Sequence, residues 1–274
     1  MTLLRKKRLR SSKEYKKELF PVFDISHVML YNMGMRLRNV HEAKSIVENS
    51  PYVIDDPYSR RGKWKSHSAK PLYVEIGMGK GRFIIETAKR NPDREFIGVE
   101  RYESVLYKAC EKMEGKPDRN PASLAIEAEE RQNTENQIGP TQGAPDNLHF
   151  LRVDARELPD IFAEGEVDGI YLNFSDPWPK ARHSKRRLTS REFLSRYEKF
   201  LKDGGILEFK TDNRPLFDFS VEEFQEADHW ELLKVTYDLH RDPVMGKGNV
   251  MTEYEKKFSA LGNKIGKLIA VYHA

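Results

Sequence analysis

The stretch that decides the fold is Tyr73–Phe83, which reads YVEIGMGKGRF. An apolar run ends around Glu75, and three glycines follow at alternate positions, Gly77, Gly79 and Gly81. Glycines let the chain turn sharply and let a ligand lie against bare peptide, and the next helix offers its unpaired N–H groups. The spacing is not the G-x-G-x-x-G of dinucleotide enzymes, and an acid just before the first glycine would repel a diphosphate. A cationic, amino-acid-bearing nucleoside fits better, which points to S-adenosylmethionine.

Strand-like and helix-like segments alternate on both sides of this loop. Strands are predicted at 71–77, 94–100, 148–155, 167–175, 205–212, 230–239 and 266–273. Helices are predicted at 81–92, 102–113, 190–202 and 215–227, the third stopping at Gly204 and Gly205. This alternation implies an α/β fold, a mostly parallel seven-stranded sheet with helices on both faces. The last two strands lack a full-length crossover helix between them, so we expect an antiparallel hairpin at the sheet edge.

Two further acids end predicted strands. Glu100 ends the second strand, where a carboxylate can accept from both ribose hydroxyls, and Asp154 ends the third, where it can accept from the adenine amino group. Each acid alone is equally well explained as a helix N-cap, and the glycine loop alone as a tight turn. Because Glu75, Glu100 and Asp154 fall at successive strand tips, we predict a nucleoside site where these tips meet.

The charge distribution favours a polyanionic partner. The net charge is only +4, but residues 1–17 hold eight Lys or Arg and one acid, and a second basic row lies at 180–187. Such patches favour nucleic acid or anionic lipid, although a solvated surface explains any one of them as well.

Several classes of protein are excluded by what the sequence lacks. Cys110 is the only cysteine, so neither an internal disulfide nor a cysteine-rich zinc site is expected. No His, Cys and acid cluster has metal-ligand spacing, so we expect no metal. No apolar run approaches the roughly 18 residues of a membrane span, and the basic N-terminus lacks the apolar core of a secretory signal. A cytoplasmic protein without a membrane partner is the prediction.

Two regions stand apart from the alternating pattern. Residues 1–34 form a basic extension, for which a disordered segment, a short helix and an arm that orders on a partner are all open alternatives, with one domain predicted over 35–274. Residues 114–147 hold four prolines, three glycines, seven acids and three bases. This composition cannot bury enough apolar surface to order the segment, so a disordered acidic insertion is expected.

The tip of the fourth predicted strand carries the most distinctive motif, NFSDPWPKARHSKRRL at 173–188. Asp176 stands at the tip, prolines on both sides of Trp178 stiffen the exit, and the basic row follows at once. The order Asp-Pro-Trp-Pro is similar to the Asn/Asp-Pro-Pro-aromatic tetrad of amino-methyltransferases. The alternative to a functional motif is a purely structural one, a loop stiffened by its prolines around a packed tryptophan.

This motif, together with EFKTDNRPLF (208–217) and MTEYEKKFSALG (251–262), resembles the bacterial tRNA (guanine-N7)-methyltransferase family. The resemblance implies a class I, Rossmann-like methyltransferase that modifies guanine 46 in the tRNA variable loop, as a monomer or a homodimer. Members of that family commonly begin near a sequence such as MRLRN, which starts here at Met35. The 34 residues before it are an extension, or Met35 is the start of the protein. These residues and the long insertion depart from the family pattern, but neither touches the motifs.

The resemblance also implies roles for individual residues. Contacts to S-adenosylmethionine, beside the glycine loop, would come from Glu75, Glu100, Asp154 and Asp176, and Asp176 would also be catalytic. The substrate nucleotide would be held by Lys180, Asp212, Thr252, Glu253, Tyr254 and Glu255. The RNA would be contacted by Arg182, His183, Lys185, Arg186 and Arg187.

The chemistry asks little of an acid or base. Guanine N7 carries an exposed lone pair, so the main tasks are alignment and the management of charge. Asp176 would orient the reactants and offset positive charge on the purine, and Asp212 or Glu255 would accept from the N1–H and N2–H donors of guanine. Trp178 or Tyr254 would stack on the base, although core packing explains Tyr254 equally well.

Three alternatives remain open at this point. The Asp-Pro-Trp motif also suits an amino-methyltransferase acting on adenine in nucleic acid. A non-catalytic RNA-binding module could retain a nucleoside-binding fold. A nicotinamide-dependent dehydrogenase is disfavoured by the glycine spacing.

Overall fold

The computed structural model describes residues 42–66, 68–116 and 143–274. The predictions for residues 1–34, for a start at Met35 and for most of the insertion at 114–147 lie outside the described residues. Asn147, at the end of that predicted insertion, is buried, and its side-chain amide donates to the carbonyl oxygens of Ala88, Asn91 and Arg94. This residue therefore ties the start of the next strand to the end of the helix at Arg82–Arg90 and to the turn that follows that helix.

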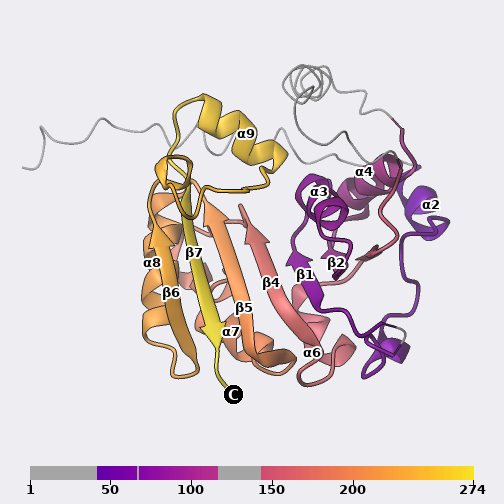
Figure 1. The fold of residues 1–274 in the computed structure, drawn as a ribbon, viewed down its shortest axis with the longest axis horizontal. Helices are drawn as coiled ribbons and strands as arrows, with labels where there is room; N and C mark the ends of the chain where they lie inside the picture. Colours follow the sequence, from indigo (N-terminus) through magenta and orange to yellow (C-terminus); the bar gives the residue numbers. More distant parts are fainter. Residues whose placement is uncertain (1–41, 67, 117–142) are drawn as a thin grey trace, which may run out of the picture. The chain divides into compact units, whose positions relative to one another are not determined.

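Seven strands of the described residues form one sheet in the order β3-β2-β1-β4-β5-β7-β6 (Figure 1). The strands are β1 (Leu72–Ile76), β2 (Glu95–Val99), β3 (Leu148–Leu151), β4 (Val167–Asn173), β5 (Leu201–Thr211), β6 (Trp230–Thr236) and β7 (Gly266–Tyr272). The first five run parallel, and β7 is antiparallel to both β5 and β6. This arrangement confirms the predicted mostly parallel sheet with an antiparallel pair at its edge.

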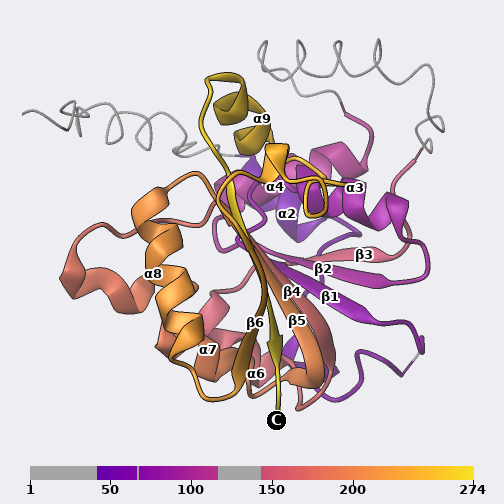
Figure 2. The same ribbon diagram turned by 60° about the vertical axis from the view of Figure 1, so that its left-hand side comes forward.

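Helices cover both faces of the sheet, as predicted. One face is covered by α3 (Arg82–Arg90) and α4 (Glu103–Met113), with α2 (Ala43–Glu48) beside α4. The other is covered by α6 (Leu158–Ile161), α7 (Arg191–Tyr197) and α8 (Arg214–Gln225), which Figure 2 shows on the opposite side. Short 3-10 turns lie at Tyr58–Arg60, Ala155–Glu157, Ala181–Arg186 and Leu239–Arg241.

The helix predicted at 190–202 is shorter than expected, and that boundary was wrong. Helix α7 ends at Tyr197, whose side chain is buried and whose hydroxyl donates a hydrogen bond to the Leu188 carbonyl oxygen (3.0 Å). Leu201 already pairs with Val167, so the sheet continues where the helical pattern appeared to run on. A shift in register follows, and Gly204 takes the left-handed conformation that it requires (φ 75°).

Three helices of the described residues have no counterpart among the predicted elements: the short α2 and α6, and α9 near the site. Helix α9 (Glu253–Ala260) lies in the connection between β6 and β7, beyond the carboxyl ends of β4 and β5 (Figure 1). Its eight residues include four charged ones, so it has no continuous apolar stripe for a periodicity argument to detect.

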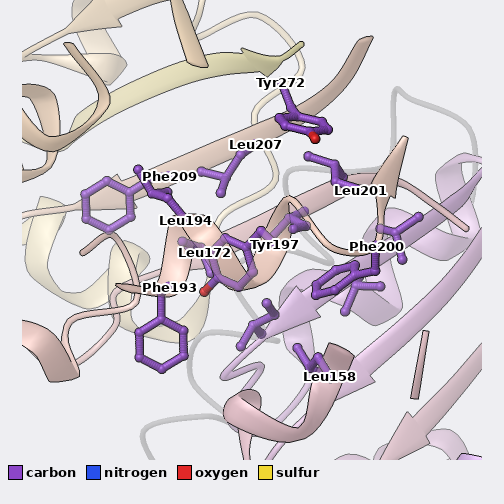
Figure 3. Packing of buried hydrophobic residues seen from close by; sticks show 14 of the residues in the cluster. Leu158, Leu172, Phe193, Leu194, Tyr197, Phe200, Leu201, Leu207, Phe209 and Tyr272 are labelled. Carbon is purple, nitrogen blue, oxygen red and sulfur yellow. The ribbon is translucent and has the colours of Figure 1, made fainter. Parts of the chain in front are cut away.

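The main hydrophobic core lies between the sheet and helices α6, α7 and α8. Figure 3 shows aromatic and aliphatic side chains of α7 and the segment after it, among them Tyr197 and Phe200, packed against Leu172, Leu207 and Phe209 of the sheet. Side chains alternate between the two faces of a strand. Glu75, Asn173 and Lys210 are each next in sequence to a core residue of their strand, and they therefore point to the opposite face, which carries α3.

No helix of the described residues is long and apolar enough to cross a membrane.

Candidate active site

The glycine loop joins β1 to α3 with all three glycines in the left-handed region. Gly77, Gly79 and Gly81 have φ values of 75°, 59° and 75°, a conformation that costs other residues free energy. A Cβ added to Gly81 would lie 2.9 Å from the Cβ of Ala109, so this glycine also lets the loop pack against α4. The loop is thus held close to the sheet, with its backbone bare of side chains at three positions.

Glu75 ends β1 beneath this loop and is only 1% exposed. Its Oε1 accepts from the side-chain amide of Asn173 (2.7 Å), whereas its buried Oε2 makes no hydrogen bond with any described residue. Burial raises the pKa of Glu75 to about 8, although the Asn173 hydrogen bond and the Lys210 charge oppose the rise. A buried carboxylate oxygen without a donor is costly, and a cationic or hydrogen-bonding ligand would relieve that cost.

Glu100 follows β2 and closes the other side of the glycine loop. Its carboxylate accepts from the backbone N–H of Gly79 (3.2 Å) and from that of Tyr102 (3.0 Å). Burial raises the pKa of Glu100, and the negative charge of Asp176 adds to the rise. Asp176 therefore lies near enough for its charge to act on the carboxylate that borders the loop.

Asp154, the third predicted acid, is tied to two arginines. Its carboxylate accepts from Arg156, through the backbone N–H (3.0 Å) and the guanidinium (2.8 and 2.9 Å), and from Arg101 (3.0 Å). The Arg156 hydrogen bond is the main reason why the pKa of Asp154 lies far below its usual range. Asp154 also caps the 3-10 turn at Ala155–Glu157. This acid therefore has the structural role of a helix cap in addition to its contacts with the two arginines.

The loop after β4 carries backbone strain on both sides of Asp176. Phe174 and Trp178 are the only non-glycine residues of the described chain with positive φ, at 52° and 42°. Such conformations cost of order 1–3 kcal/mol each and persist where the surroundings enforce them. Here the Phe174 N–H donates to the Lys210 carbonyl oxygen (2.8 Å), and the Phe174 ring packs against Tyr254 (5.0 Å between centroids). These contacts hold Asp176 at the surface, near the Glu100 carboxylate.

The basic row divides into cations with different surroundings. Arg187 donates to the carbonyl oxygens of Pro177 and Trp178 (3.1 Å each) and lies over the Phe219 ring, so it holds the Asp176 loop. Arg186 lies over the Trp178 ring, at 5.0 Å from its centroid, and remains exposed. Lys180 and Arg182 are also exposed.

Two members of the row are less suited to binding a phosphate. Lys185 pairs with Glu192 on α7 (3.0 Å). Slight desolvation and the neighbouring cations, Arg186 foremost, lower the pKa of His183, so its ring is neutral at neutral pH. The ring of His183 meets the Trp178 ring edge-on.

The residues at the end of β5 and just after it, 211–213, make polar contacts and begin helix α8. Asp212 accepts from the side-chain amide of Asn263 (2.9 Å). Asn213 caps α8 by accepting from the Leu216 N–H (2.9 Å), and Thr211 accepts from the Asn213 N–H (3.1 Å). These two neighbours of Asp212 therefore shape the turn between β5 and α8.

The segment 252–255 is used to build the fold around the site. Thr252 caps α9 by accepting from the Glu255 N–H (2.9 Å), and Glu253 pairs with Lys112 of α4. Tyr254 packs between Phe174 and Phe258, with 4.0 Å between its ring centroid and that of Phe258.

Glu255 differs from its expected role as a direct substrate contact, because it is fully buried. Its oxygens accept from Lys210 (2.7 Å), His240 (2.9 Å) and Asn249 (2.6 Å). Both Glu255 oxygens are therefore already used by donors of the protein itself, unlike Oε2 of Glu75, and Glu255 acts through the segment that it holds. Lys210 was not predicted; the only signal was a lysine inside an otherwise buried strand, ILEFKT.

Among residues 42–66, 68–116 and 143–274, no group of three or more His, Cys, Asp or Glu side chains is arranged to hold a metal ion.

Comparisons with known proteins agree with this geometry. A family model described as "Putative methyltransferase" matches residues 69–268. A tRNA (guanine-N(7)-)-methyltransferase of Lachnoclostridium phytofermentans is 47% identical over 238 residues, which cover 86% of this chain and 98% of that protein. The protein of that name from Bacillus subtilis is 41% identical over 234 residues, 84% of this chain and 96% of that protein.

Solved structures support the fold. A 16S rRNA (adenine(1408)-N(1))-methyltransferase from Catenulisporales acidiphilia superposes with a TM-score of 0.52 at 14% identity, covering 82% of this chain and 97% of that one. The sheet is therefore that of the class I, Rossmann-like methyltransferases.

Proposed function

The chain belongs to the tRNA (guanine-N7)-methyltransferase family, and on this premise we propose that it methylates N7 of guanine 46 in the variable loop of tRNA. The methyl donor is S-adenosylmethionine. The observation that carries the proposal is the group of carboxylates around the glycine loop: buried Glu75 and Glu100 with surface Asp176 next to them. This arrangement suits a cationic donor on one side and a purine that becomes cationic on the other.

The described residues fit S-adenosylmethionine. The buried, unpaired Oε2 of Glu75 provides an acceptor for a cationic ligand, and the glycine loop provides bare backbone beside it. In this proposal Glu100 accepts from the ribose hydroxyls and Asp154 from the adenine amino group, which would share Asp154 with Arg101 and Arg156. When bound, S-adenosylmethionine supplies an electrophilic methyl group.

The proposed role of Asp176 is electrostatic. Guanine N7 needs no deprotonation, so the enzyme aligns the base and stabilises the positive charge that develops on it. Asp176 is placed for this by two strained residues and by Arg187, without being buried itself. Asp212 is the proposed acceptor for guanine N1–H and N2–H. Thr252, the first residue of the 252–255 motif and the cap of α9, is proposed to assist it.

We assign the RNA contacts mainly to Lys180, Arg182 and Arg186, because these cations are exposed. Phosphate contacts fix the position of a nucleic acid, and base contacts select it. Cations directly after Asp176 would hold the backbone on either side of the target base. A tRNA substrate also favours action in the cytoplasm.

Replacing Arg182 and Arg186 together by alanine is expected to weaken tRNA binding and to reduce its salt dependence. Each lost phosphate contact lowers the slope of log K against log salt by about 1, so the double variant should lose about 2. Filter binding between roughly 50 and 200 mM salt measures this slope. The matched control is Lys199→Ala/Lys202→Ala, which removes two exposed cations near the start of β5. An unchanged slope in the Arg182/Arg186 variant would contradict the RNA role.

The test of the function is methyl transfer from labelled S-adenosylmethionine to tRNA that lacks 7-methylguanosine, followed by nucleoside analysis. We expect labelled 7-methylguanosine, and none on a transcript in which guanine 46 is replaced by adenine. Labelled 6-methyladenosine would support the adenine-specific alternative. Binding of tRNA without any transfer would support the non-catalytic RNA-binding module.

A further inference from the structure

A buried ionic network joins β5 to the connection between β6 and β7. The ammonium group of Lys210 donates to Glu255 Oε2 (2.7 Å), to Asn249 Oδ1 (3.0 Å) and to the Val250 carbonyl oxygen (2.9 Å). The side chains of Lys210 and Glu255 are 3% and 0% exposed. Charges removed from water this completely are retained only where the geometry satisfies them, and losing one partner leaves the other uncompensated.

The Lys210–Glu255 pair fixes the path of the long connection between β6 and β7. His240, Asn249, Val250 and Glu255 come from different parts of the chain between β6 and β7, and each bonds either to the Lys210 ammonium or to its Glu255 partner. Although burial alone would raise it, the Lys210 charge and the hydrogen bonds hold the pKa of Glu255 below its usual range. Burial lowers the pKa of Lys210, and the charge and hydrogen bond of Glu255 oppose that fall, so each residue favours the charged form of the other.

Lys210 also reaches the two other parts of the site. It pairs in register with Asn173 of β4, and Asn173 is the residue that hydrogen-bonds Glu75. Its carbonyl oxygen accepts from the N–H of strained Phe174, which precedes the Asp176 loop. The backbone of this residue thus joins the strand that supports Glu75 and the loop of Asp176, and its side chain joins both to the segment that begins α9.

We propose that Lys210 is a positioning residue for the methyl transfer, which holds the start of α9 and the Asp176 loop in fixed relation to Glu75. This inference rests on the proposed function. Figures 1 and 2 both show α9 beyond the carboxyl ends of the strands, where the nucleoside site lies. A second ion pair among the described residues, between Glu253 and Lys112, also holds α9 and is less deeply buried than the Lys210–Glu255 pair. Because losing one partner of a fully buried pair leaves the other charge uncompensated, we expect the Lys210–Glu255 pair to contribute more to the alignment.

The test compares Lys210→Met with a matched control, Lys267→Met. Lys267 lies opposite Lys210 on β7 and pairs with Glu208 of β5 (2.6 Å), so its loss also removes a partly buried cation from the same region. Single-turnover methyl transfer is measured with saturating S-adenosylmethionine and tRNA. The amplitude reports the fraction of folded, loaded enzyme, and the rate constant reports alignment.

We expect Lys210→Met to lower the rate constant by about tenfold without loss of amplitude, because small misplacements of reacting groups are costly. Lys267→Met should leave the rate constant unchanged. If Lys210→Met lost amplitude and kept the wild-type rate constant, Lys210 would have only a structural role and the proposal would be overturned.

A second variant, Lys210→Met/Glu255→Met, keeps the test decisive if the single variant folds poorly. Replacing a buried ion pair by apolar residues of similar size is often neutral for stability. We expect this double variant to regain thermal stability but not the rate constant. Recovery of both would overturn the inference, whereas a wild-type enzyme that fails to methylate tRNA would overturn the proposed function itself.

Discussion

Asp176→Ala is expected to lower kcat for methyl transfer by about 10³-fold, the upper end of what removing one electrostatic stabiliser costs, while tRNA affinity stays within about threefold. The side chain is exposed, so its truncation creates no cavity and leaves no buried partner. The loop around it stays in place because Arg187 donates to Pro177 and Trp178, and Phe174 is held by Lys210 and Tyr254. Transfer rates and filter binding on the same preparations separate the two effects.

Two further variants sharpen this prediction. Asp176→Asn keeps the shape and removes the charge, so it should be nearly as slow as Asp176→Ala if the carboxylate stabilises the cationic purine. Asp93→Ala, which removes an exposed carboxylate in the turn before β2, is the control and should keep full activity. An Asp176→Asn enzyme of near wild-type rate would show that the charge is not needed.

Much of the fold could be predicted because periodicity is a local property of the chain. Buried runs such as YVEI and IYLN mark parallel strands, and the intervening segments follow a helical period. The end of α7 could not be predicted this way, because Tyr197, Phe200 and Leu201 are all apolar in sequence whether they belong to a helix or a strand. Only the pairing of Leu201 with Val167 decides between the two.

For the site, too, the positions of residues along the chain could be predicted, but their contacts could not. Glu75, Glu100, Asp154 and Asp176 were predicted to lie at strand tips because a parallel sheet brings its carboxyl ends together. In the structure Glu75 lies near the end of β1 and Glu100 directly follows β2, whereas Asp154 and Asp176 lie three residues past the ends of β3 and β4. The surroundings of each side chain are non-local. Nothing in the sequence near Glu255 indicates Lys210, 45 residues away, or that Arg187 turns back to hold the loop rather than facing solvent.

Glu75→Gln is expected to weaken S-adenosylmethionine binding by about 100-fold and to remove its pH dependence. In the wild type the buried carboxyl is largely protonated below its pKa of about 8, and a cationic ligand favours the ionised form. Binding must then displace a proton, so the wild-type affinity should fall by about tenfold for each pH unit below 8. The groups that face Glu75 are Asn173 from β4, Lys210 from β5, Glu100 beyond β2 and the Ile84 N–H of α3.

The same substitution should stabilise the free protein at neutral pH. The pKa of Glu75 rises on folding from its ordinary value of 4.5, so the folded state binds the extra proton and stability falls as the pH rises from 4.5 to 8. At pH 7 this loss is about 3 kcal/mol, and glutamine, which resembles the protonated acid, avoids it. The control is Glu166→Gln, since buried Glu166 accepts from the N–H groups of Gly62, Trp64 and Ala163 and should lose stability when neutralised.

Thermal unfolding at pH 5 and pH 7, together with calorimetric titration of S-adenosylmethionine from pH 6 to 8.5, measures both effects. The stability gain of Glu75→Gln should be small at pH 5 and large at pH 7, because at the higher pH the wild-type carboxyl is ionised in the unfolded chain but must stay protonated in the folded one. Loss of ligand affinity with a gain in stability is the result expected of a carboxylate kept unpaired for a cationic ligand. A Glu75→Gln protein that is less stable at both pH values and binds S-adenosylmethionine as the wild type does would mean that Glu75 is a structural residue and that the cofactor lies elsewhere.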